Sequence, residues 1–577
     1  MLSRKIQREI YLKLKLIYRE QNVHNETNEI ITIINNFNKR KKRKEIKVSE
    51  RLAMVICYGD SIIEKNKSQH LKTFKKFHKK YLENHFNAIH FLPFYPSSSD
   101  SGFSVIDHYK IDKRLGSWKD INNFSKKNII MGDVVINHAS ARGLWFKNYL
   151  KNKSPGKNYF LTVDNKFNTK NVVRPREHKL LTKIKIFNKN DYLWRTFSPD
   201  QIDLNFRNPK VLLRFFKIMI NLINHGVNIF RLDAVAYLWK KSGTKCVNLP
   251  ETHNIIKFLR YVTEKLNTKT LLVSETNLPE PENRSYFGNL NESNWIYNFS
   301  LPPLLVHGFL FEDGSKLYKW SKQLPMANLG NSYLNFIASH DGIGMRPAEG
   351  ILDKKTQEKL IKRLKKNGGE VSYRKVKGKG KKIYEANITL ANAFKFTDLD
   401  LKGKYFYDRF ISAHAIMIAF EGIPAIYFNS IFGTSNDESK FIISGNKRDL
   451  NRYRWNKTRL EKLLKIKNSK QRILYNNITL LLNIRKKQKS FHPNAKRFSI
   501  NLGSNFFAFK RISLDKKQTI FSITNMTSTY QTTKIGKNYL GWQNLLDSKL
   551  NYKDNQLVMS PFQTIWLKKN NILFLIT

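Results

Sequence analysis

The chain has 577 residues, 41% of them hydrophobic, and carries 103 Lys and Arg against 45 Asp and Glu. This length and apolar fraction predict a globular protein with two or more domains around one large one. A formal charge of +58 ordinarily points to a nucleic acid or an anionic surface as partner. Here the excess is mostly lysine spread over nearly every predicted helix, and no recognised nucleic-acid module accompanies it. We therefore expect no nucleic-acid partner.

The two cysteines, Cys57 and Cys246, give neither a disulfide framework nor a metal-binding spacing. The N-terminal stretch MLSRKIQREIYLKLKLIY is charged throughout and does not have the pattern of a signal peptide. No apolar run approaches the roughly 18–20 residues of a membrane span. We expect a cytoplasmic protein in a reducing compartment, with no membrane association and no metal.

The first 50 residues are predicted to hold an amphipathic helix and a basic linker. Ile6, Ile10, Leu14 and Ile17 recur at helical spacing within residues 1–22. Such a helix docks on the main domain or on a partner, and ordinary packing is the simpler interpretation. The following NNFNKRKKRKEIK, residues 35–47, is predicted to be a solvated linker.

From residue 51 the chain alternates short apolar runs with longer helical patterns. The runs lie at 52–57, 88–96, 129–137, 227–232, 271–275, 295–300, 333–341 and 423–428. Eight strands separated by helices predict an α/β fold, a (β/α)₈ TIM barrel. Two connections, 139–208 and 342–404, are longer than ordinary barrel loops. After the barrel, short runs that alternate apolar and polar residues predict further strands. The expected domains are barrel strands 1–3 at 51–138, an inserted B-type subdomain at 139–208, the remaining barrel at 209–485 with a long active-site loop at 342–404, and a small C-terminal all-β domain at 486–577.

Polar residues follow several of these strands at their carboxyl ends, the face of a barrel that carries its chemistry. Asp133, Asn137 and His138 close the third strand, Arg231 and Asp233 the fourth, Glu275 the fifth, and His340 and Asp341 the seventh. Taken singly, each has a structural alternative, such as a buried ion pair between Arg231 and Asp233. Like charges repel, so a cluster of carboxylates from three strands persists only where something offsets its cost.

Four segments together resemble the α-amylase superfamily of α-glycoside-active barrels: GDVVINH (132–138), FRLDAVAY (230–237), VSET (273–276) and ASHD (338–341). Further segments are similar to its sucrose phosphorylase branch, among them SSDSGFSVIDHYKID (98–112), FSPDQIDLN (197–205), SHDGIGMRPAEGIL (339–352) and KRDLNRY (447–453). Within that branch, LDAVAYLWKKSGT and ETNLPEPENRSYFG resemble the glucosylglycerate phosphorylases more than the sucrose enzymes.

The resemblance implies a role for each matched residue. Asp233 would be the nucleophile, Glu275 the general acid and base, and Asp341 the stabiliser of the transition state. Arg231 would keep Asp233 ionised, while the adjacent charges of Asp233 and Asp341 would raise the pKa of Glu275. His138, His340, Asp100 and Arg448 would hydrogen-bond the sugar. Phe103 and Phe197 would cover the faces of its ring. Gln201 and Tyr237 match flanking positions of the family's site.

Phosphorolysis requires an anion site beside the glucosyl carbon and poor access for water. Arg176 and Tyr384 match a phosphate-binding arginine and a loop tyrosine of the sucrose phosphorylases. Two places before that tyrosine, where the sucrose enzymes have an acidic residue, this chain has Lys382. A cation there fits a carboxylate-bearing acceptor such as glycerate better than neutral fructose.

The sequence therefore predicts a retaining α-glucoside phosphorylase that forms α-glucose 1-phosphate, with glucosylglycerate favoured as substrate over sucrose. Two alternatives stay open: a hydrolase or transglucosidase of the same fold, and a catalytically silent barrel that acts as a binding protein. The expected partners are a small sugar and inorganic phosphate as co-substrate, with no further cofactor. A homodimer is left open.

Overall fold

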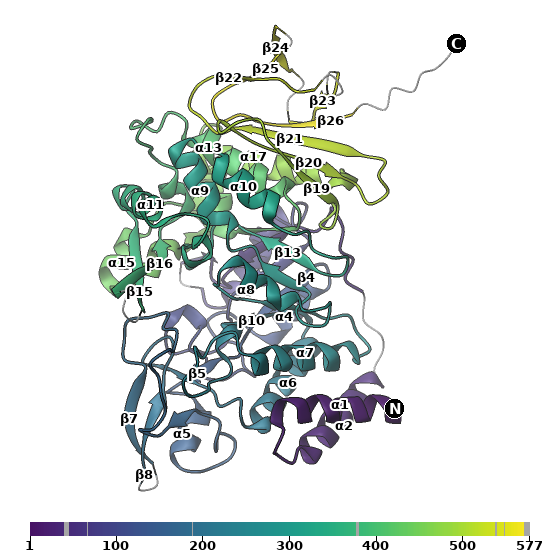
Figure 1. Ribbon diagram of the computed structural model, residues 1–577, viewed down its shortest axis with the longest axis vertical. Helices are drawn as coiled ribbons and strands as arrows, with labels where there is room; N and C mark the ends of the chain where they lie inside the picture. The colour runs from purple at the N-terminus through teal and green to yellow at the C-terminus, as the bar shows by residue number, and fades with distance from the viewer. Residues whose placement is uncertain are drawn as a thin grey trace.

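A computed structural model describes residues 1–39, 45–65, 67–186, 189–376, 380–536, 539, 541–546, 549–554 and 556–569. Eight parallel strands close into a barrel in the order β1-β17-β13-β12-β11-β10-β4-β3, which confirms the (β/α)₈ prediction (Figure 1). The strands are β1 (Met54–Cys57), β3 (Ala88–Phe91), β4 (Ile129–Val135), β10 (Val227–Asp233), β11 (Leu271–Ser274), β12 (Trp295–Tyr297), β13 (Ser332–Asn335) and β17 (Ile423–Tyr427).

The strand that carries the central polar pair is buried from end to end. In β10 every residue except Asn228 is buried, because helices cover the outside of the barrel and side chains fill the inside. Helix α6 (Pro209–Asn224) leads into this strand, capped by the Asn208 side chain and followed by a turn at Gly226. Gly226 has a φ of 93°, and a Cβ there would collide with Ser125, so the turn requires glycine.

Helices surround the barrel and continue the chain to the C-terminal domain. They are α3 (His70–Tyr81), α4 (Trp118–Ser125), α6, α7 (Pro250–Glu264), α8 (Glu280–Arg284), α9 (Leu301–Phe311), α10 (Ser315–Gln323), α13 (Phe406–Ala419), α14 (Phe428–Ile431), α15 (Glu438–Ser444), α16 (Lys457–Lys465) and α17 (Lys470–Arg485). The short strands β2 (Ile62–Ile63) and β18 (Trp455–Asn456) pair with each other.

The N-terminal segment forms two helices where one helix and a linker were expected. Helix α1 (Arg4–Tyr18) packs against α7, and α2 (His24–Asn38) packs against α6 (Figure 1). Asn38 donates to the carbonyl oxygen of Lys265 at 2.8 Å and accepts from the backbone of Asn267 at 2.6 Å. The expected linker at 35–47 thus begins inside α2, and its residues 40–44 lie outside the described residues.

The segment between β4 and α6 forms a small subdomain of its own. It contains β5 (His138–Ser140), α5 (Leu144–Leu150), β6 (Thr162–Val163), β7 (Leu181–Ile186), β8 (Lys189–Trp194) and β9 (Gln201–Asp203). The buried ammonium of Lys240, which follows β10, lies 2.5 Å from Asp203 Oδ2 and 3.1 Å from Asn137 Oδ1. This ion pair ties the subdomain to the barrel.

The segment after β13, predicted as a long loop, has secondary structure of its own. It contains β14 (Ile343–Gly344), a 3₁₀ turn (Arg346–Ala348), α11 (Lys354–Lys366), β15 (Glu370–Val376), β16 (Gly380–Asn387) and α12 (Leu390–Ala393). Strand β16 lies between β14 and β15, and Gly344 is opposite Glu385. The hairpin formed by β15 and β16 therefore fixes the position of Glu385 relative to Gly344.

The C-terminal domain is all-β and packs on α10 and α13, at the end of the molecule away from the inserted subdomain (Figure 1). Its sheets are β19-β20-β21-β26-β23 and β22-β25-β24. The strands are β19 (Lys496–Ile500), β20 (Phe506–Ile512), β21 (Thr519–Asn525), β22 (Gln531–Thr533), β23 (Gln543–Asn544), β24 (Asn551–Lys553), β25 (Gln556–Met559) and β26 (Thr564–Lys568). Buried Arg497 joins this domain to the barrel through Glu421, at 3.0 Å.

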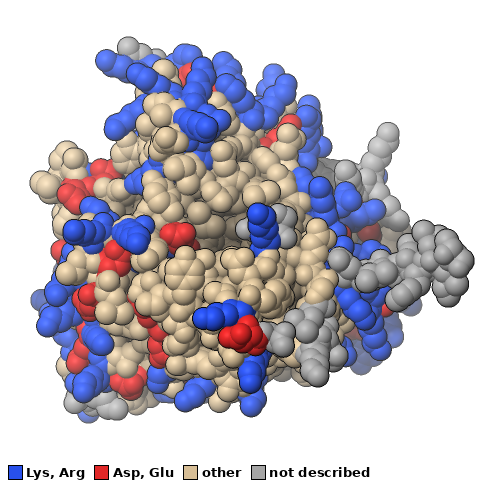
Figure 2. Space-filling model, turned by 90° about the horizontal axis from the view of Figure 1, so that it is seen from above, with Lys and Arg blue, Asp and Glu red and all other residues tan. Residues whose placement is uncertain are grey.

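The surface shows how the positive charge is distributed. Lys and Arg are spread over much of the face seen from above, with Asp and Glu among them (Figure 2). In the described part of the chain, no helix combines the length and the apolar character needed to cross a bilayer.

Candidate active site

Arg231 is the centre of the barrel mouth because its guanidinium contacts three carboxylates. Its Nη1 donates to Asp233 Oδ1 at 2.7 Å and also to Asp133 Oδ1. Its Nη2 lies 3.8 Å from Glu275 Oε1, while Glu275 Oε2 accepts a hydrogen bond from the Ala234 backbone at 2.9 Å. One buried cation therefore bridges the predicted nucleophile and the predicted acid.

The two predicted catalytic carboxyls have strongly shifted proton affinities. Burial raises the pKa of Asp233 to about 7 and the pKa of Glu275 to about 7, and the charge of Asp341 adds to both increases. Arg231 opposes both shifts, but it shares its charge with Asp133, so it offsets burial only in part. The direct hydrogen bond from Arg231 favours the proton on Glu275 rather than on Asp233.

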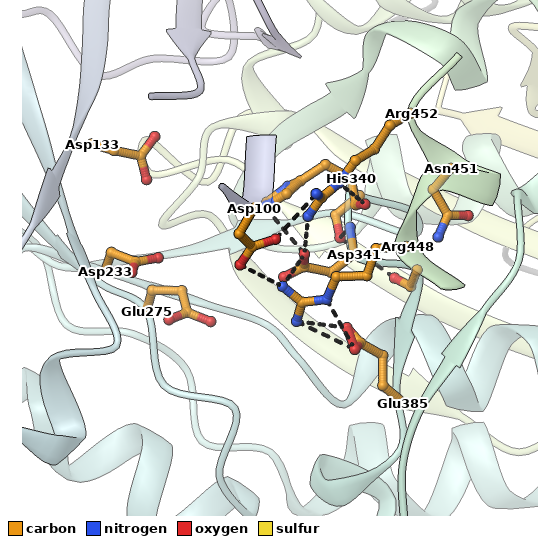
Figure 3. A network of polar contacts seen from close by, with 12 residues as sticks. Asp100, Asp133, Asp233, Glu275, His340, Asp341, Glu385, Arg448, Asn451 and Arg452 are labelled. Atoms are coloured by element: carbon orange, nitrogen blue, oxygen red, sulfur yellow. Dashed lines mark hydrogen bonds and ion pairs between the residues drawn. The ribbon is translucent and has the colours of Figure 1, made fainter. Parts of the chain in front are cut away.

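Asp341 has the opposite environment, on the other side of the pocket (Figure 3). Its Oδ1 lies 2.9 Å from Arg448 Nη1 and 3.2 Å from Arg452 Nη2. Although burial acts against it, the charges of Arg448, His340 and Arg452 hold the pKa of Asp341 well below its usual range. Asp100 lies 3.1 Å from Arg452 and 3.7 Å from Arg448, so two arginines hold two carboxylates in place.

Aromatic rings and histidines line the wall between these two clusters. Phe103 stacks on His340 with ring centroids 5.0 Å apart and an interplanar angle of 7°. The backbone oxygen of Phe103 is 3.0 Å from His138 Nε2 and accepts from Gln201 Nε2 at 3.3 Å. Burial lowers the pKa of His340 to about 3, so this ring is neutral near physiological pH.

A third group of residues comes from the inserted subdomain and the hairpin. Arg176 lies over the ring of Tyr384, 5.2 Å from its centroid, and 3.8 Å from the carboxylate of Glu385. Glu385 is buried and also accepts hydrogen bonds from Arg448 at 3.2 and 3.3 Å (Figure 3). Burial raises the pKa of Glu385.

One pocket collects nearly all of the predicted site residues. Phe197 and Tyr237 meet edge to face in its lining, with centroids 5.4 Å apart. Lys382 is the exception: it is half-buried on β16 opposite Arg374 and is not among the lining residues in the described part of the chain. The predicted residues that line the pocket are Asp100, Phe103, His138, Arg176, Phe197, Gln201, Arg231, Asp233, Tyr237, Glu275, His340, Asp341, Tyr384 and Arg448.

Comparison with known proteins gives the family. The alpha amylase catalytic-domain model matches residues 78–342. The chain is 36% identical to the glucosylglycerate phosphorylase of Allomeiothermus silvanus, over 91% of this chain and 92% of that one. It is 33% identical to the Escherichia coli glucosylglycerate phosphorylase, over 91% and 93% of the two chains. The chain belongs to the glucosylglycerate phosphorylase family, within the alpha-amylase superfamily.

Other family members and solved structures are more distant. The sucrose phosphorylase of Bifidobacterium adolescentis is 27% identical over 66% of this chain and 76% of its own. The crystal structure of sucrose 6F-phosphate phosphorylase from Thermoanaerobacter thermosaccharolyticum superposes with a TM-score of 0.72 at 22% identity, covering 85% of this chain and 98% of that one. That likeness supports the same fold.

The structure adds site residues that sequence reasoning did not select. Asp133 was noted as a strand-end residue but was not assigned to the site. In the structure it forms an ion pair with Arg231, and its Oδ2 lies 2.8 Å from His90 Nε2. Arg452 stands within the segment 447–453 that resembles the family, four residues after the selected Arg448, and Glu385 directly follows the selected Tyr384. Their position close to selected residues in the sequence was the only indication that they belong to the site. The side chains that they contact could not be known without the fold.

Proposed function

We propose that this chain is a retaining phosphorylase that transfers the glucosyl group of a small α-glucoside to inorganic phosphate, with α-glucosylglycerate as the favoured substrate. The observation that carries the proposal is the contact of Arg231 with both Asp233 and Glu275, at 2.7 and 3.8 Å. The same pocket contains Arg176, a cation suited to phosphate. Relatives at 33–36% identity over most of the chain bear the name glucosylglycerate phosphorylase.

In the first half-reaction Asp233 attacks the anomeric carbon of the bound glucoside. The bond from that carbon to the glyceryl oxygen breaks, and Glu275 gives its proton to the departing oxygen. The raised pKa of Glu275 supplies this proton near neutral pH. Asp341, kept ionised by Arg448 and Arg452, stabilises the positive charge that develops on the sugar ring.

In the second half-reaction an oxygen of inorganic phosphate attacks the same carbon from the opposite face of the ring. The bond to Asp233 breaks, and the ionised Glu275 accepts the proton that the incoming phosphate releases. Two inversions give α-glucose 1-phosphate with retained configuration. Arg176 would hold the phosphate, with Tyr384 packed beneath its guanidinium. No metal or organic cofactor is needed for either half.

The first experiment measures glucose 1-phosphate released by the purified protein from α-glucosylglycerate and from sucrose, each with and without inorganic phosphate. We expect phosphate-dependent α-glucose 1-phosphate, formed faster from glucosylglycerate. Free glucose formed equally well without phosphate would instead show a hydrolase of the same fold. Absence of any product from these or other α-glucosides would favour the silent barrel.

A further inference from the structure

Arg346 is a buried cation that has no acidic partner among the residues that the structure describes. Its side chain is on the 3₁₀ turn after β14, and the residue is only 6% exposed. Its Nε and Nη1 atoms are buried without a hydrogen-bond partner, and no ion pair joins Arg346 to any residue that the structure describes. Leaving a guanidinium buried and unpaired costs several kcal/mol, so an anion is expected to complete this site.

The turn that carries Arg346 belongs to the acceptor side of the pocket. Gly344, two residues earlier, lines the pocket and pairs with Glu385. The backbone N–H of Met345 donates to the carbonyl oxygen of Tyr384 at 2.9 Å. Arg346 is therefore fixed to the hairpin segment that brings Tyr384 and Glu385 to the pocket.

The charge of Arg346 also acts on Tyr237, a residue of the pocket. Burial raises the pKa of Tyr237, and the positive charge of Arg346 is the largest influence that opposes this shift, ahead of Arg374 and Arg176. Tyr237 lines the pocket together with Glu275. Arg346 is not itself among the described residues that line the pocket, but its charge acts on Tyr237, which is.

The neighbouring Arg374 and Arg176 differ from Arg346 because each lies close to a carboxylate. Arg374 is hydrogen-bonded to Glu349 at 2.7 Å, and Arg176 lies 3.8 Å from Glu385. A second unsatisfied group lies nearby: Asn277 Oδ1 is buried without a partner, and Asn277 lines the pocket two residues after Glu275. A Cβ on Gly344 would lie 3.1 Å from this oxygen, so glycine leaves room between Asn277 and the turn.

We infer that Arg346 binds the carboxylate of an anionic aglycone, a hydroxy acid, and so determines the preference for that acceptor, while Asn277 hydrogen-bonds its hydroxyl groups. This inference rests on the proposed phosphorylase function. It assigns to Arg346 the role that the sequence gave to Lys382. Arg176 still binds phosphate. The carboxylate of the aglycone and the phosphate, which occupy the acceptor side one after the other, are therefore bound by different arginines.

The test compares Arg346→Gln with the wild type on two substrates that differ at one group of the aglycone. α-Glucosylglycerate carries a carboxylate where α-glucosylglycerol has a hydroxymethyl group. Because a hydrogen bond to a charged group contributes about 1.5–3 kcal/mol, we expect kcat/KM for glucosylglycerate to fall about 10- to 100-fold. For glucosylglycerol we expect a change of less than about threefold, with the KM for phosphate unchanged.

Two further variants separate binding from structure. Arg346→Lys keeps the charge without the fork and is expected to lie between the wild type and Arg346→Gln on glucosylglycerate. Lys354→Gln removes a positive charge from the 91% exposed side chain of Lys354 on α11 and should leave both substrates unaffected. Should Arg346→Gln fail to fold, the substrate ratio is read from Arg346→Lys.

Equal losses on both substrates, or full activity of Arg346→Gln on glucosylglycerate, would overturn the inference. A raised KM for phosphate with glucosylglycerol as donor would mean that Arg346 binds phosphate and would also overturn it. The substrate ratio can be measured whether the product is glucose 1-phosphate or glucose. A wild type that releases only glucose would thus contradict the proposed function while leaving the assignment of Arg346 testable.

Discussion

The two halves of the pocket are built from different parts of the chain and carry opposite charge. The sugar-facing half is formed mainly where barrel strands end, whereas the acceptor-facing half comes from the inserted subdomain and the hairpin β15–β16. The first half has more carboxylates than guanidiniums: Asp100, Asp133, Asp233, Glu275 and Asp341 against Arg231, Arg448 and Arg452. Guanidiniums are in excess around the second: Arg176, which lines the pocket, with Arg346 and Arg374, which do not, against Glu349 and Glu385.

This difference matches the charges that each half meets in the proposed reaction. Negative charge around the glucosyl ring stabilises a transition state with positive character at the anomeric carbon. Positive charge beyond that carbon attracts phosphate and a carboxylate-bearing acceptor. Changes in the first half should therefore affect chemistry, and changes in the second should affect which anion reacts.

Asp233→Asn gives the largest expected effect, because it removes the nucleophile of the sugar-facing half. We expect kcat to fall by more than about 10⁴-fold, as found when an enzyme loses a covalent nucleophile. Mass spectrometry should show a glucosyl adduct on the wild-type chain and none on the variant. The thermal midpoint should be retained, and a variant that is active yet carries no adduct would contradict the double-displacement mechanism.

Lys240→Met tests the link between the two halves. The ammonium of Lys240 is buried against Asp203 and Asn137, so methionine leaves the Asp203 carboxylate without its cation. Breaking a buried pair from one side costs about 3–5 kcal/mol, and we expect that loss in denaturant unfolding. Early proteolysis within residues 139–208 should accompany it. The matched control Lys241→Met changes an exposed neighbour, and an equal loss there would argue against a link role for Lys240.

Arg176→Gln should affect the acceptor-facing half alone. We expect the KM for phosphate to rise about 10- to 100-fold, because a charged hydrogen bond is lost, while the rate of glucosyl-enzyme formation changes little. Single-turnover measurements without phosphate separate the two steps. Lys381→Gln neutralises an exposed cation of the same region, paired with Glu177 at 2.9 Å, and serves as the control. A slower first step in Arg176→Gln would place Arg176 in the sugar-facing half instead.

The sequence predicted which residues meet at the barrel mouth because barrel strands leave a strong signal. Strands such as β4 and β10 are buried on both faces and appear as apolar runs, and the polar residues that end them mark the barrel mouth. What the pattern could not show is how charge is shared across strands. Asp133 and Arg231 are paired in register, so Arg231 divides its charge, and the pKa of Asp233 rises rather than staying low.

The acceptor-facing half was predicted less completely because it depends on loop conformation. Residues 342–404 read as a long loop, and its hairpin and α11 set which side chains face the pocket. Arg346 was part of a matched segment, yet only the fold shows that it is buried, with its Nε and Nη1 lacking a partner among the described residues. Lys382 was chosen from its place before Tyr384, but the strand puts it opposite Arg374. Helix α2 was missed because its polar sequence buries only a narrow apolar stripe.

The pH dependence gives the smallest and most specific test of the sugar-facing half. The pair must hold one proton on Glu275 while Asp233 is ionised, so kcat/KM should fall on both sides of about pH 7, where burial has raised the pKa of both carboxyls. Asp133→Asn removes a charge that raises the pKa of Asp233 and leaves more of the charge of Arg231 to Asp233. The acid limb should therefore move to lower pH, while the alkaline limb, set by Glu275, moves less. A shift of both limbs together, or of the acid limb to higher pH, would show that Asp133 does not act through Asp233.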